Sequence, residues 1–381
     1  MSDFLKNSLK ICYISLSFPP IPGGISTVIV SMCSELAERG HEVEVLTGTI
    51  KKTHLGTRDE ETHNDNQYNF VVKRFNCTSL PILAQLEFSK KVGKYLVTKD
   101  FDVIHLHSPL ILPPKGDHRF IVTMHNSLKA ELSVSNMKNW YSLFTLFASP
   151  LLLHFERRNV LEAKKVICVS RATEKSLRTT YGEKSFEVVY NGLNPSTLVA
   201  VNSDNKTKKR DYVLYTGLFI TIKGIRDILK IAKILKNINF VLVGTGPLFK
   251  KYKSMKDRLG LENVLMTGKI PRYELLKRYN EAKIFLFPTY FDTFGMSVLE
   301  AMFLELPILS TNVGGIPELI THEVEGILVP PGDVDAMVKW IQRLMEDESL
   351  RARLAKAAKE KANKEFTIKK TVDRLLELYK E

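Results

Sequence analysis

Two acidic side chains stand on either side of a short apolar run, at a spacing that suits the binding of a polyhydroxylated ligand. In the stretch FDTFGMSVLEAM, Asp292 precedes an expected helix at about Met296–Leu304, and Glu300 lies within that helix. Glu300 follows the helix start by about one turn, at a rise of ~1.5 Å per residue. Both carboxylates can therefore accept hydrogen bonds from the vicinal hydroxyls of one ribose or hexose. A surface helix with two solvated acids is the alternative interpretation.

The start of the same helix suits an anion. Asp292 and Thr293 supply cap chemistry, and the first amides of a helix have no intrahelical partner. These amides and the helix dipole favour negative charge at that end. The apolar run Ile284–Phe287, closed by Pro288, predicts a buried strand before the helix. The residues would therefore lie at the carboxyl end of a strand, where open α/β sheets bind ligands.

A second glycine turn precedes a helix near the N-terminus. The apolar run Lys10–Leu16 predicts a strand, Gly23 and Gly24 follow it, and apolar residues then recur at helical spacing as far as Gly40. Glycines allow a phosphate to approach the backbone amides, although such a turn often only redirects the chain. No GxGxxG pattern occurs here, which argues against an NAD-dependent dehydrogenase.

The composition indicates two domains and an anionic partner. The chain has 381 residues and a formal net charge of +13, with 44% hydrophobic and 25% charged residues. This length exceeds what one hydrophobic core usually organises. The positive balance favours nucleotide phosphates or an anionic membrane surface. Nucleic acid is not expected, because no zinc-finger spacing, RNP-like motif or basic-aromatic repeat occurs.

The cysteines and the hydropathy predict a cytoplasmic protein. The four cysteines are scattered without a CxxC pair, which is typical of reduced thiols. The first ten residues lack the apolar region of a signal peptide, and no uninterrupted apolar run approaches the ~20 residues that span a bilayer. The stretch Trp140–Phe155, which Pro150 interrupts, predicts a pair of core helices. Its alternative interpretation is an interfacial surface that meets a lipid-linked acceptor at the inner face of the membrane.

Strand-like runs alternate with helix-length segments along both halves of the chain, as in parallel α/β sheets. The polar segment 51–69 predicts a solvated loop, and 202–211 a linker between the halves. A Lys-rich helix at about 349–363 and a last helix close the chain. The further strands expected are 42–46, 71–75, 103–106, 120–124, 166–169 and 187–190 in the first half, and 212–215, 240–243, 264–267, 284–287, 308–310 and 326–329 in the second.

His125 follows the expected strand Phe120–Met124 at its carboxyl end. It can contact or orient a sugar, or it can be a loop histidine with a backbone partner. His105 and His107 point to one side of their strand and could join His125 in a zinc site. No acid or cysteine completes such a site at a recognisable spacing.

Nine motifs taken together resemble the retaining family 4 glycosyltransferases. In order they are PGGIST, VSRAT, VYNGLNP, KG, VGTGP, TGKI, DTFGMSVLEAM, NVGGIPELI and GILVPPGD. No one of them is decisive, but their order across nearly the whole chain is highly specific. The resemblance implies the GT-B fold, in which two Rossmann-like doubly wound α/β domains face each other across a cleft. It assigns residues 1–197 to an acceptor-binding domain and 198–365 to a nucleotide-sugar domain, with the helix at 366–381 packing back on the first.

The resemblance also implies a role for individual residues. Glu300 would bind the ribose hydroxyls, Asp292 the hydroxyls of the donor sugar, and Lys223 the diphosphate. His125 would contact the transferred sugar, and Ile270 the base through its backbone. A fixed cation and amide dipoles are needed because negative charge develops on the departing diphosphate. The scheme needs no metal and no cofactor beyond a UDP- or GDP-linked donor. The remaining donor-binding positions are Gly23, Gly24, Gly217, Gly268, Phe294, Gly295, Met296, Ser297 and Val298.

Two positions depart from the family pattern. Asp292 stands where the family usually has Glu, and Leu218 stands where it usually has an arginine that binds phosphate. The expected function is transfer of a hexose from a nucleoside diphosphate sugar to a glycan or lipid-linked acceptor. Loss of the arginine favours an alternative, a catalytically weak, donor-binding partner subunit of another transferase. A nucleotide-sugar epimerase is a third interpretation.

Overall fold

The chain folds into two compact units. A computed structural model describes residues 8–21, 23–50, 65–78, 81–107, 111–112, 120–128, 140–182, 184–198 and 210–381. One unit comprises Met1–Gly192 together with Ile368–Glu381, and the other comprises Leu193–Thr367. The sequence-based divisions, after residues 197 and 365, lie close to these. Most of the polar segment 51–69 and of the expected linker 202–211 lies outside the described residues.

The first unit contains a parallel sheet of seven strands in the order β3-β2-β1-β4-β5-β6-β7. Its central strands are buried apolar runs, as expected for a parallel sheet covered on both faces. Their bounds agree with the sequence-based strands to within a few residues at each end. The strands are β1 Lys10–Ile14, β2 Glu42–Ile50, β3 Val71–Cys77, β4 Val103–Leu106, β5 Phe120–Met124, β6 Lys165–Cys168 and β7 Phe186–Val188.

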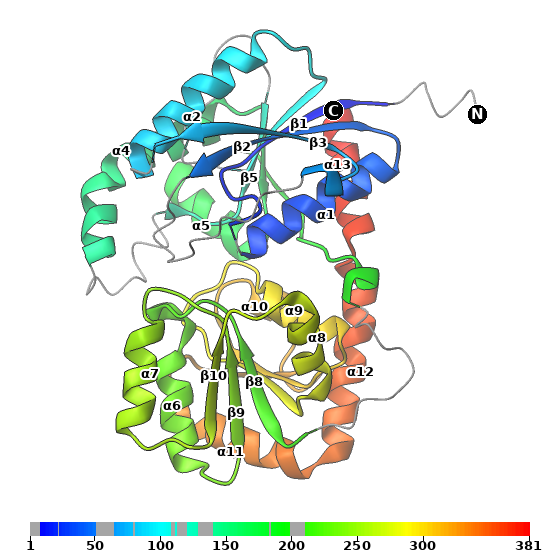
Figure 1. The fold of residues 1–381 in the computed structure, drawn as a ribbon. Helices are drawn as coiled ribbons and strands as arrows, with labels where there is room; N and C mark the ends of the chain where they lie inside the picture. The colour runs from blue at the N-terminus through cyan, green and yellow to red at the C-terminus, as the bar shows by residue number, and fades with distance from the viewer. Residues whose placement is uncertain are drawn as a thin grey trace. The chain divides into compact units, whose positions relative to one another are not determined.

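Helices of the first unit include the C-terminal helix, α13, which contacts α1 (Figure 1). Arg374 of α13 forms an ion pair with Glu187 at 3.0 Å, and the Thr371 hydroxyl donates to the Tyr190 carbonyl.

The prediction of a helix break at Pro150 was wrong, because a single helix, α4, runs through it. The helices are α1 Gly24–Glu38, α2 Pro81–Leu96, α4 Trp140–Glu162, α5 Arg171–Tyr181 and α13 Ile368–Lys380, with a 3-10 turn, η2, at Asp65–Gln67.

The second unit contains a parallel sheet of six strands in the order β10-β9-β8-β11-β12-β13. The chain order changes direction between β8 and β11, so the carboxyl ends of these two neighbouring strands form the topological switch point of the sheet. The strands are β8 Tyr212–Thr216, β9 Asn239–Val243, β10 Val264–Gly268, β11 Ile284–Phe287, β12 Ile308–Thr311 and β13 Ile327–Val329.

The helices of the second unit form two layers. Helix α6 contacts α7 and α11, whereas α9 contacts α12. Because parallel crossovers are right-handed, the units β8-α6-β9 and β9-α7-β10, which advance in one direction, place α6 and α7 on the same face of the sheet. The helices are α6 Ile225–Ile234, α7 Phe249–Arg258, α8 Arg272–Glu281, α9 Met296–Phe303, α10 Ile316–Leu319, α11 Val334–Glu346 and α12 Glu348–Glu365, with 3-10 turns η3 Pro195–Leu198 and η4 Thr221–Lys223.

Candidate functional site

The backbone at Asp292 is held by a neighbouring loop. After β11 the chain leaves the sheet at Pro288, and the Gly315 amide donates to the Asp292 carbonyl at 3.0 Å. Gly314 has a φ of +53°, and a Cβ there would lie 1.9 Å from the Asp292 carbonyl oxygen. Only glycine permits this approach of two backbones. The GG pair of the NVGGIPELI motif therefore fixes the position from which the Asp292 side chain extends.

Lys223 and Asp292 form an ion pair at the switch point. Lys223 Nζ lies 2.7 Å from Asp292 Oδ2, and the two side chains are only 16% and 15% exposed. The other carboxylate oxygen of Asp292 accepts a hydrogen bond from the Phe294 amide at 3.1 Å. Lys223 Nζ also lies 5.2 Å from the centre of the Phe287 ring, which borders it on a further side. The pair is therefore a fixed cation and anion, largely removed from water, at the start of α9.

The start of α9 has no side-chain cap. Its N-cap residue is Gly295, which has a φ of +95° and makes no side-chain capping bond. The expectation that Asp292 and Thr293 cap this helix was wrong, because the Asp292 carboxylate binds the Phe294 amide before the helix begins. The first intrahelical bond runs from Leu299 N to Gly295 O. The amides that precede Leu299 carry the positive end of the helix dipole beside the Lys223 ammonium.

Glu300 is held by two donors from α8. Arg272 Nη1 donates to one carboxylate oxygen at 2.7 Å, and the Tyr279 hydroxyl donates to the other at 3.0 Å. The Thr216 hydroxyl lies 2.6 Å from the same Tyr279 oxygen. Burial, and then the nearby Glu300 carboxylate, raise the pKa of Tyr279, so the phenol keeps its proton. Glu300 is 13% exposed and is thus a preoriented acceptor with lone pairs still available.

Three glycines lie at the carboxyl ends of neighbouring strands. The Gly244 amide donates to the Gly268 carbonyl, and a Cβ on Gly244 would lie 1.9 Å from the Gly217 carbonyl oxygen. The half-buried Ile270 follows β10 at the same edge. These turns bring bare backbone to the side of the sheet from which Asp292 and Glu300 extend. Glycine is needed here for close packing, since a Cβ on Gly217 would likewise lie 2.7 Å from the Tyr215 hydroxyl.

The first unit also places its candidate residues at the carboxyl edge of its sheet. Gly23 is the N-cap of α1, with a φ of +154°, and a Cβ there would meet no atom within 4 Å. His125 directly follows β5 and is 5% exposed. Its Nε2 lies 3.1 Å from His107 Nδ1, so its hydrogen-bond partner among the described residues is a second imidazole. Burial lowers the pKa of His125 to about 4, so the ring is neutral at pH 7.

His105 belongs to a buried hydrogen-bonded cluster and not to a metal site. Its Nδ1 lies 2.6 Å from the Tyr379 hydroxyl of α13, and its Nε2 lies 2.7 Å from the Thr123 hydroxyl. Burial, with a smaller effect of His125, lowers its pKa to about 3. Across the described ranges, no group of three or more His, Cys, Asp and Glu side chains could hold a metal ion. The zinc hypothesis for the three histidines therefore has no support in the geometry.

Comparisons with known proteins agree with this geometry. A family model described as Glycosyltransferase Family 4 matches residues 22–197, and a second, described as Glycosyl transferases group 1, matches residues 200–361. The chain belongs to the family 4 glycosyltransferases. The two models together match most of both units, so the family assignment does not depend on one motif.

Several relatives extend over nearly the whole family 4 glycosyltransferase chain. An uncharacterised glycosyltransferase of Methanocaldococcus jannaschii is 26% identical over 98% of each chain. The N-acetyl-alpha-D-glucosaminyl L-malate synthase of Bacillus anthracis is 24% identical over 96% of each. Among solved structures, the sucrose-phosphate synthase of Thermosynechococcus elongatus has a TM-score of 0.81 at 21% identity, covering 97% and 98% of the two chains. Anabaena HepE, solved with UDP and glucose, has a TM-score of 0.75 at 19% identity, covering 98% and 100%. These similarities show the GT-B fold.

The structure of this glycosyltransferase adds Arg272 and Tyr279, the two residues that hold Glu300, to the predicted set. Arg272 was missed, because a basic residue at the start of an exposed helix is common. Its place directly after the TGKIP turn, at the carboxyl end of β10, was the signal that could have identified it. Lys223 and Asp292 were expected to act on different parts of the donor, and the structure shows that they contact each other. Leu218, in place of the arginine, is half-buried, and its carbonyl accepts from the Tyr215 hydroxyl.

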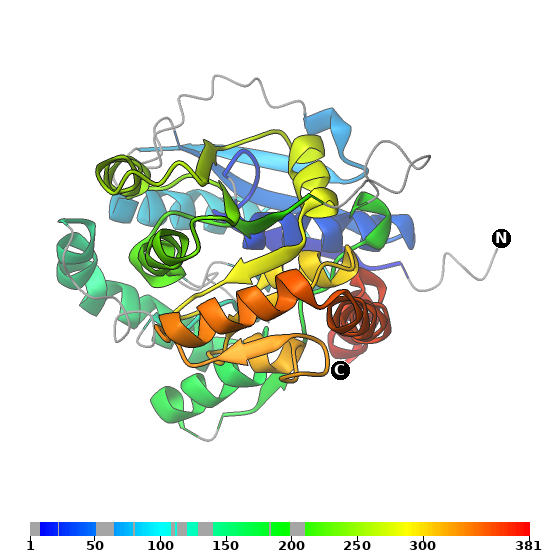
Figure 2. The same ribbon diagram turned by 90° about the horizontal axis from the view of Figure 1, so that it is seen from below.

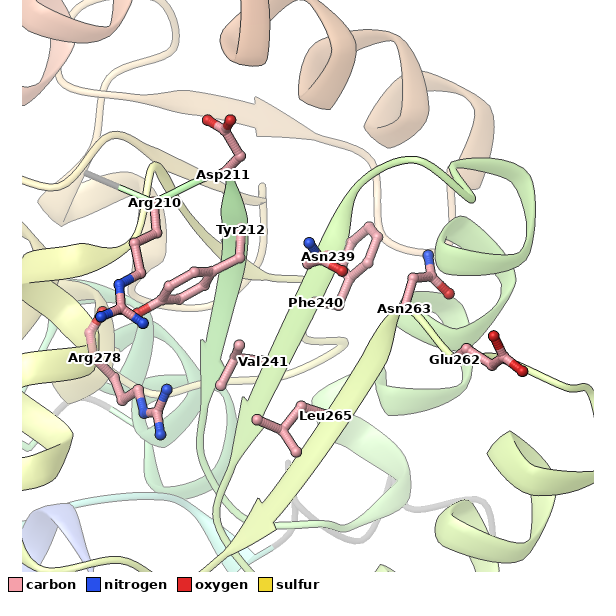
Figure 3. A pocket seen from close by; sticks show the side chains of 10 residues that line it. All are labelled: Arg210, Asp211, Tyr212, Asn239, Phe240, Val241, Glu262, Asn263, Leu265 and Arg278. Atoms are coloured by element: carbon pink, nitrogen blue, oxygen red, sulfur yellow. The ribbon is translucent and has the colours of Figure 1, made fainter. Parts of the chain in front are cut away.

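A separate pocket of about 320 Å³ lies at the opposite edge of the second sheet (Figure 3). It is bordered by Tyr212 and Asn239, the first residues of β8 and β9. Its two arginines have acidic neighbours, since Arg210 lies 3.3 Å from Glu281 and Arg278 lies 3.2 Å from Glu274. None of the predicted donor-binding residues lines this pocket.

Within the described residues, no helix has the length and hydropathy that a bilayer crossing requires.

Proposed function

We propose that this family 4 glycosyltransferase transfers a hexose, with retention of the anomeric configuration, from a nucleoside diphosphate sugar to a glycan or lipid-linked acceptor. The observation that supports it most directly is the Lys223–Asp292 ion pair, 2.7 Å long, beside the uncapped start of α9. A cation and helix amides at one point suit a departing diphosphate. An acceptor carboxylate at the same point suits the hydroxyls of the sugar.

Each part of the donor has a matching group in the second unit. Lys223 Nζ and the first amides of α9 stabilise the negative charge that develops on the diphosphate. Asp292 accepts hydrogen bonds from the sugar, and Glu300, held in place by Arg272 and Tyr279, accepts those of the ribose. The glycine turns at β8 and β10 admit the nucleotide against bare backbone, with Ile270 beside the base. In this scheme Lys223 and the amides replace a metal, so chelation by EDTA should leave turnover unchanged.

A uridine-linked donor is the first candidate. Anabaena HepE, which shares the fold, was solved with UDP and glucose. A thermal-shift screen against UDP, GDP and ADP tests the base, since a ligand that binds only the folded state raises the unfolding midpoint. A shift with UDP alone supports the uridine donor, and a shift with GDP alone replaces it with a guanosine donor.

The reaction itself is tested by incubating the protein with the selected nucleotide sugar and an acceptor glycan. Release of the nucleoside diphosphate, together with a product that retains the anomeric configuration by NMR, is the expected result. An inverted product contradicts retention. Isomerised donor without release of nucleotide would identify an epimerase.

Leu218 favours a second candidate, a donor-binding partner subunit with weak activity of its own. A bidentate guanidinium is absent at this position, so one phosphate contact of the family is lost. Donor binding without turnover supports this candidate. Leu218→Arg should then raise turnover, if the pocket keeps the geometry of the family.

A further inference from the structure

Two neighbouring helices of the second unit carry about half of the net charge of the chain. α6 has three basic residues and one acidic residue, and α7 has five and one, so their combined net charge is +6 out of +13 for the whole chain. One of the two acids, Asp227, is buried and bound by Lys230 and Tyr290. The surface of these helices is therefore almost purely cationic.

The charges lie on the outer faces of both helices. In α6, the exposed residues Arg226, Lys230, Lys233 and Ile234 recur at a spacing of three to four and form one stripe, while Ile228 and Ile231 are fully buried. Figures 1 and 2 both show α7 beside α6, and the two helices contact each other. We call the following six exposed side chains the basic face: Arg226, Lys233, Lys250, Lys251, Lys253 and Arg258.

Within the described residues, no acidic side chain forms an ion pair with a member of the basic face. The two other lysines of α6 and α7 do have acidic partners, since Lys230 pairs with Asp227 and Lys256 with Asp257. Helix α12 is the useful contrast. It is also rich in lysine, but Lys356 has Glu360 at 4.0 Å, Lys359 has Glu305 at 2.8 Å and Lys361 has Glu325 at 3.9 Å. The charge of α12 is thus largely compensated by the protein itself, whereas that of the basic face is left to a partner.

Exposed aliphatic side chains distinguish between the anionic partners. Ile234, at the end of α6, is 55% exposed, and Leu259, directly after α7, is 36% exposed. The aromatic rings of α7 point inwards, since Tyr252 is buried and the Phe249 ring packs 5.0 Å from that of Phe219. Protein surfaces that bind single-stranded nucleic acid usually offer aromatic rings for base stacking. Protein surfaces that bind a bilayer interface combine cations with aliphatic residues.

We propose that the basic face of α6 and α7 binds an anionic phospholipid surface, with Ile234 and Leu259 entering the interface. This inference is independent of the donor chemistry, because none of its residues belongs to the candidate site. The attraction should weaken with salt, since it depends on exposed charges.

The test is cosedimentation of the full chain with vesicles of phosphatidylcholine alone or with added phosphatidylglycerol. Binding to the anionic vesicles should exceed binding to the neutral ones. Each lysine near a charged surface contributes up to about a fivefold factor, so replacing Lys233, Lys250, Lys251 and Lys253 by glutamine should weaken binding by up to several hundredfold, and by at least ~tenfold if each contributes only about half of that free energy. The matched control replaces the α12 lysines 356, 359, 361 and 364 by glutamine, which removes the same charge, and it should change binding by less than ~threefold.

Three results would overturn the proposal. One is the absence of binding to anionic vesicles. Another is equal weakening by the two quadruple variants, which would mean that only the overall charge matters. The last is binding of single-stranded RNA, but not of vesicles, at the same salt concentration. Thermal unfolding of both variants confirms that each is folded, and Ile234→Ser with Leu259→Ser should weaken vesicle binding without changing the net charge.

Discussion

Replacing Lys223 by alanine tests the chemistry of the candidate site most directly. Its ammonium lies 2.7 Å from Asp292 Oδ2, and both side chains are about five-sixths buried, at 16% and 15% exposed. Leu218 supplies no cation where the family usually has an arginine. Lys223 is therefore expected to be the main side-chain cation that faces the departing diphosphate, together with the helix amides.

The Lys223→Ala substitution removes a cation that stabilises the diphosphate and leaves the Asp292 carboxylate unpaired, and both changes lower kcat. Loss of one preorganised group that stabilises developing charge costs roughly 3–4 kcal/mol, or a factor of about 10²–10³ in kcat. The substitution also leaves the Asp292 carboxylate without its counter-ion. At an effective dielectric of about 20, two unit charges of the same sign ~4 Å apart repel each other by ~4 kcal/mol. The unpaired Asp292 carboxylate therefore also opposes the negative charge that develops on the diphosphate. We expect kcat to fall at least ~10²-fold.

The assay is release of nucleoside diphosphate at saturating nucleotide sugar, with calorimetry of nucleotide binding alongside. A larger fall in kcat than in nucleotide affinity indicates stabilisation in the transition state. Lys223→Arg should recover only part of the activity. It keeps the positive charge, but a planar guanidinium does not place that charge where the compact ammonium does.

The double variant Lys223→Ala with Asp292→Asn separates two explanations. If Lys223 only neutralises Asp292, removing both charges should restore turnover towards that of Asp292→Asn alone. If Lys223 acts on the diphosphate, the double variant stays at least as impaired as Lys223→Ala. Turnover of Lys223→Ala within about threefold of the unmodified enzyme refutes the reasoning, because that loss is under ~1 kcal/mol.

Three further predictions concern the ribose contact, the backbone of the site and the buried histidines. Glu300→Gln should lower nucleotide affinity at least ~tenfold, because hydrogen bonds to a charged acceptor contribute roughly 1.5–3 kcal/mol, and unchanged affinity by calorimetry removes the ribose role. Gly314→Ala should lower the free energy of unfolding by more than ~2 kcal/mol in urea titrations, because its Cβ would lie 1.9 Å from a carbonyl oxygen at a φ of +53°. The control, Gly93→Ala in α2, has open space and should stabilise by ~0.5–1 kcal/mol; equal effects of the two contradict the clash. Burial lowers the pKa of His105 to about 3 and of His125 to about 4, so below about pH 6.5 the unfolded chain binds protons that the folded chain does not. The free energy of unfolding should therefore fall by up to ~1.4 kcal/mol per pH unit for each histidine on acidification towards pH 4, and a thermal midpoint independent of pH in this window contradicts their burial.

Most of the fold could be predicted because its signals are local. Buried parallel strands are short apolar runs bounded by polar residues or proline, so β4, β5 and β11 were placed at their observed ends. The placement of His125 directly after a strand and of Glu300 about one turn inside a helix was predicted for the same reason, since both places are read from adjacent residues.

Two sequence-based predictions were wrong because each rested on the usual preference of one residue type. Pro150 predicted a break, yet α4 continues through it, since a proline removes one backbone hydrogen bond while its neighbours keep theirs. Asp292 has the residue type of a helix cap, but its carboxylate binds Lys223 and the Phe294 amide instead.

The sequence by itself determined the order of strands and helices, the glycine turns and the residue types available for binding a nucleotide sugar, because each depends on neighbours along the chain. The tertiary structure decided which of those residues act together. Lys223 meets Asp292, Arg272 meets Glu300 and His107 meets His125 only after the sheets have formed. The members of each pair lie on different elements, and side chains so far apart in sequence are brought within hydrogen-bond distance by the pairing of parallel strands and by the packing of helices against them.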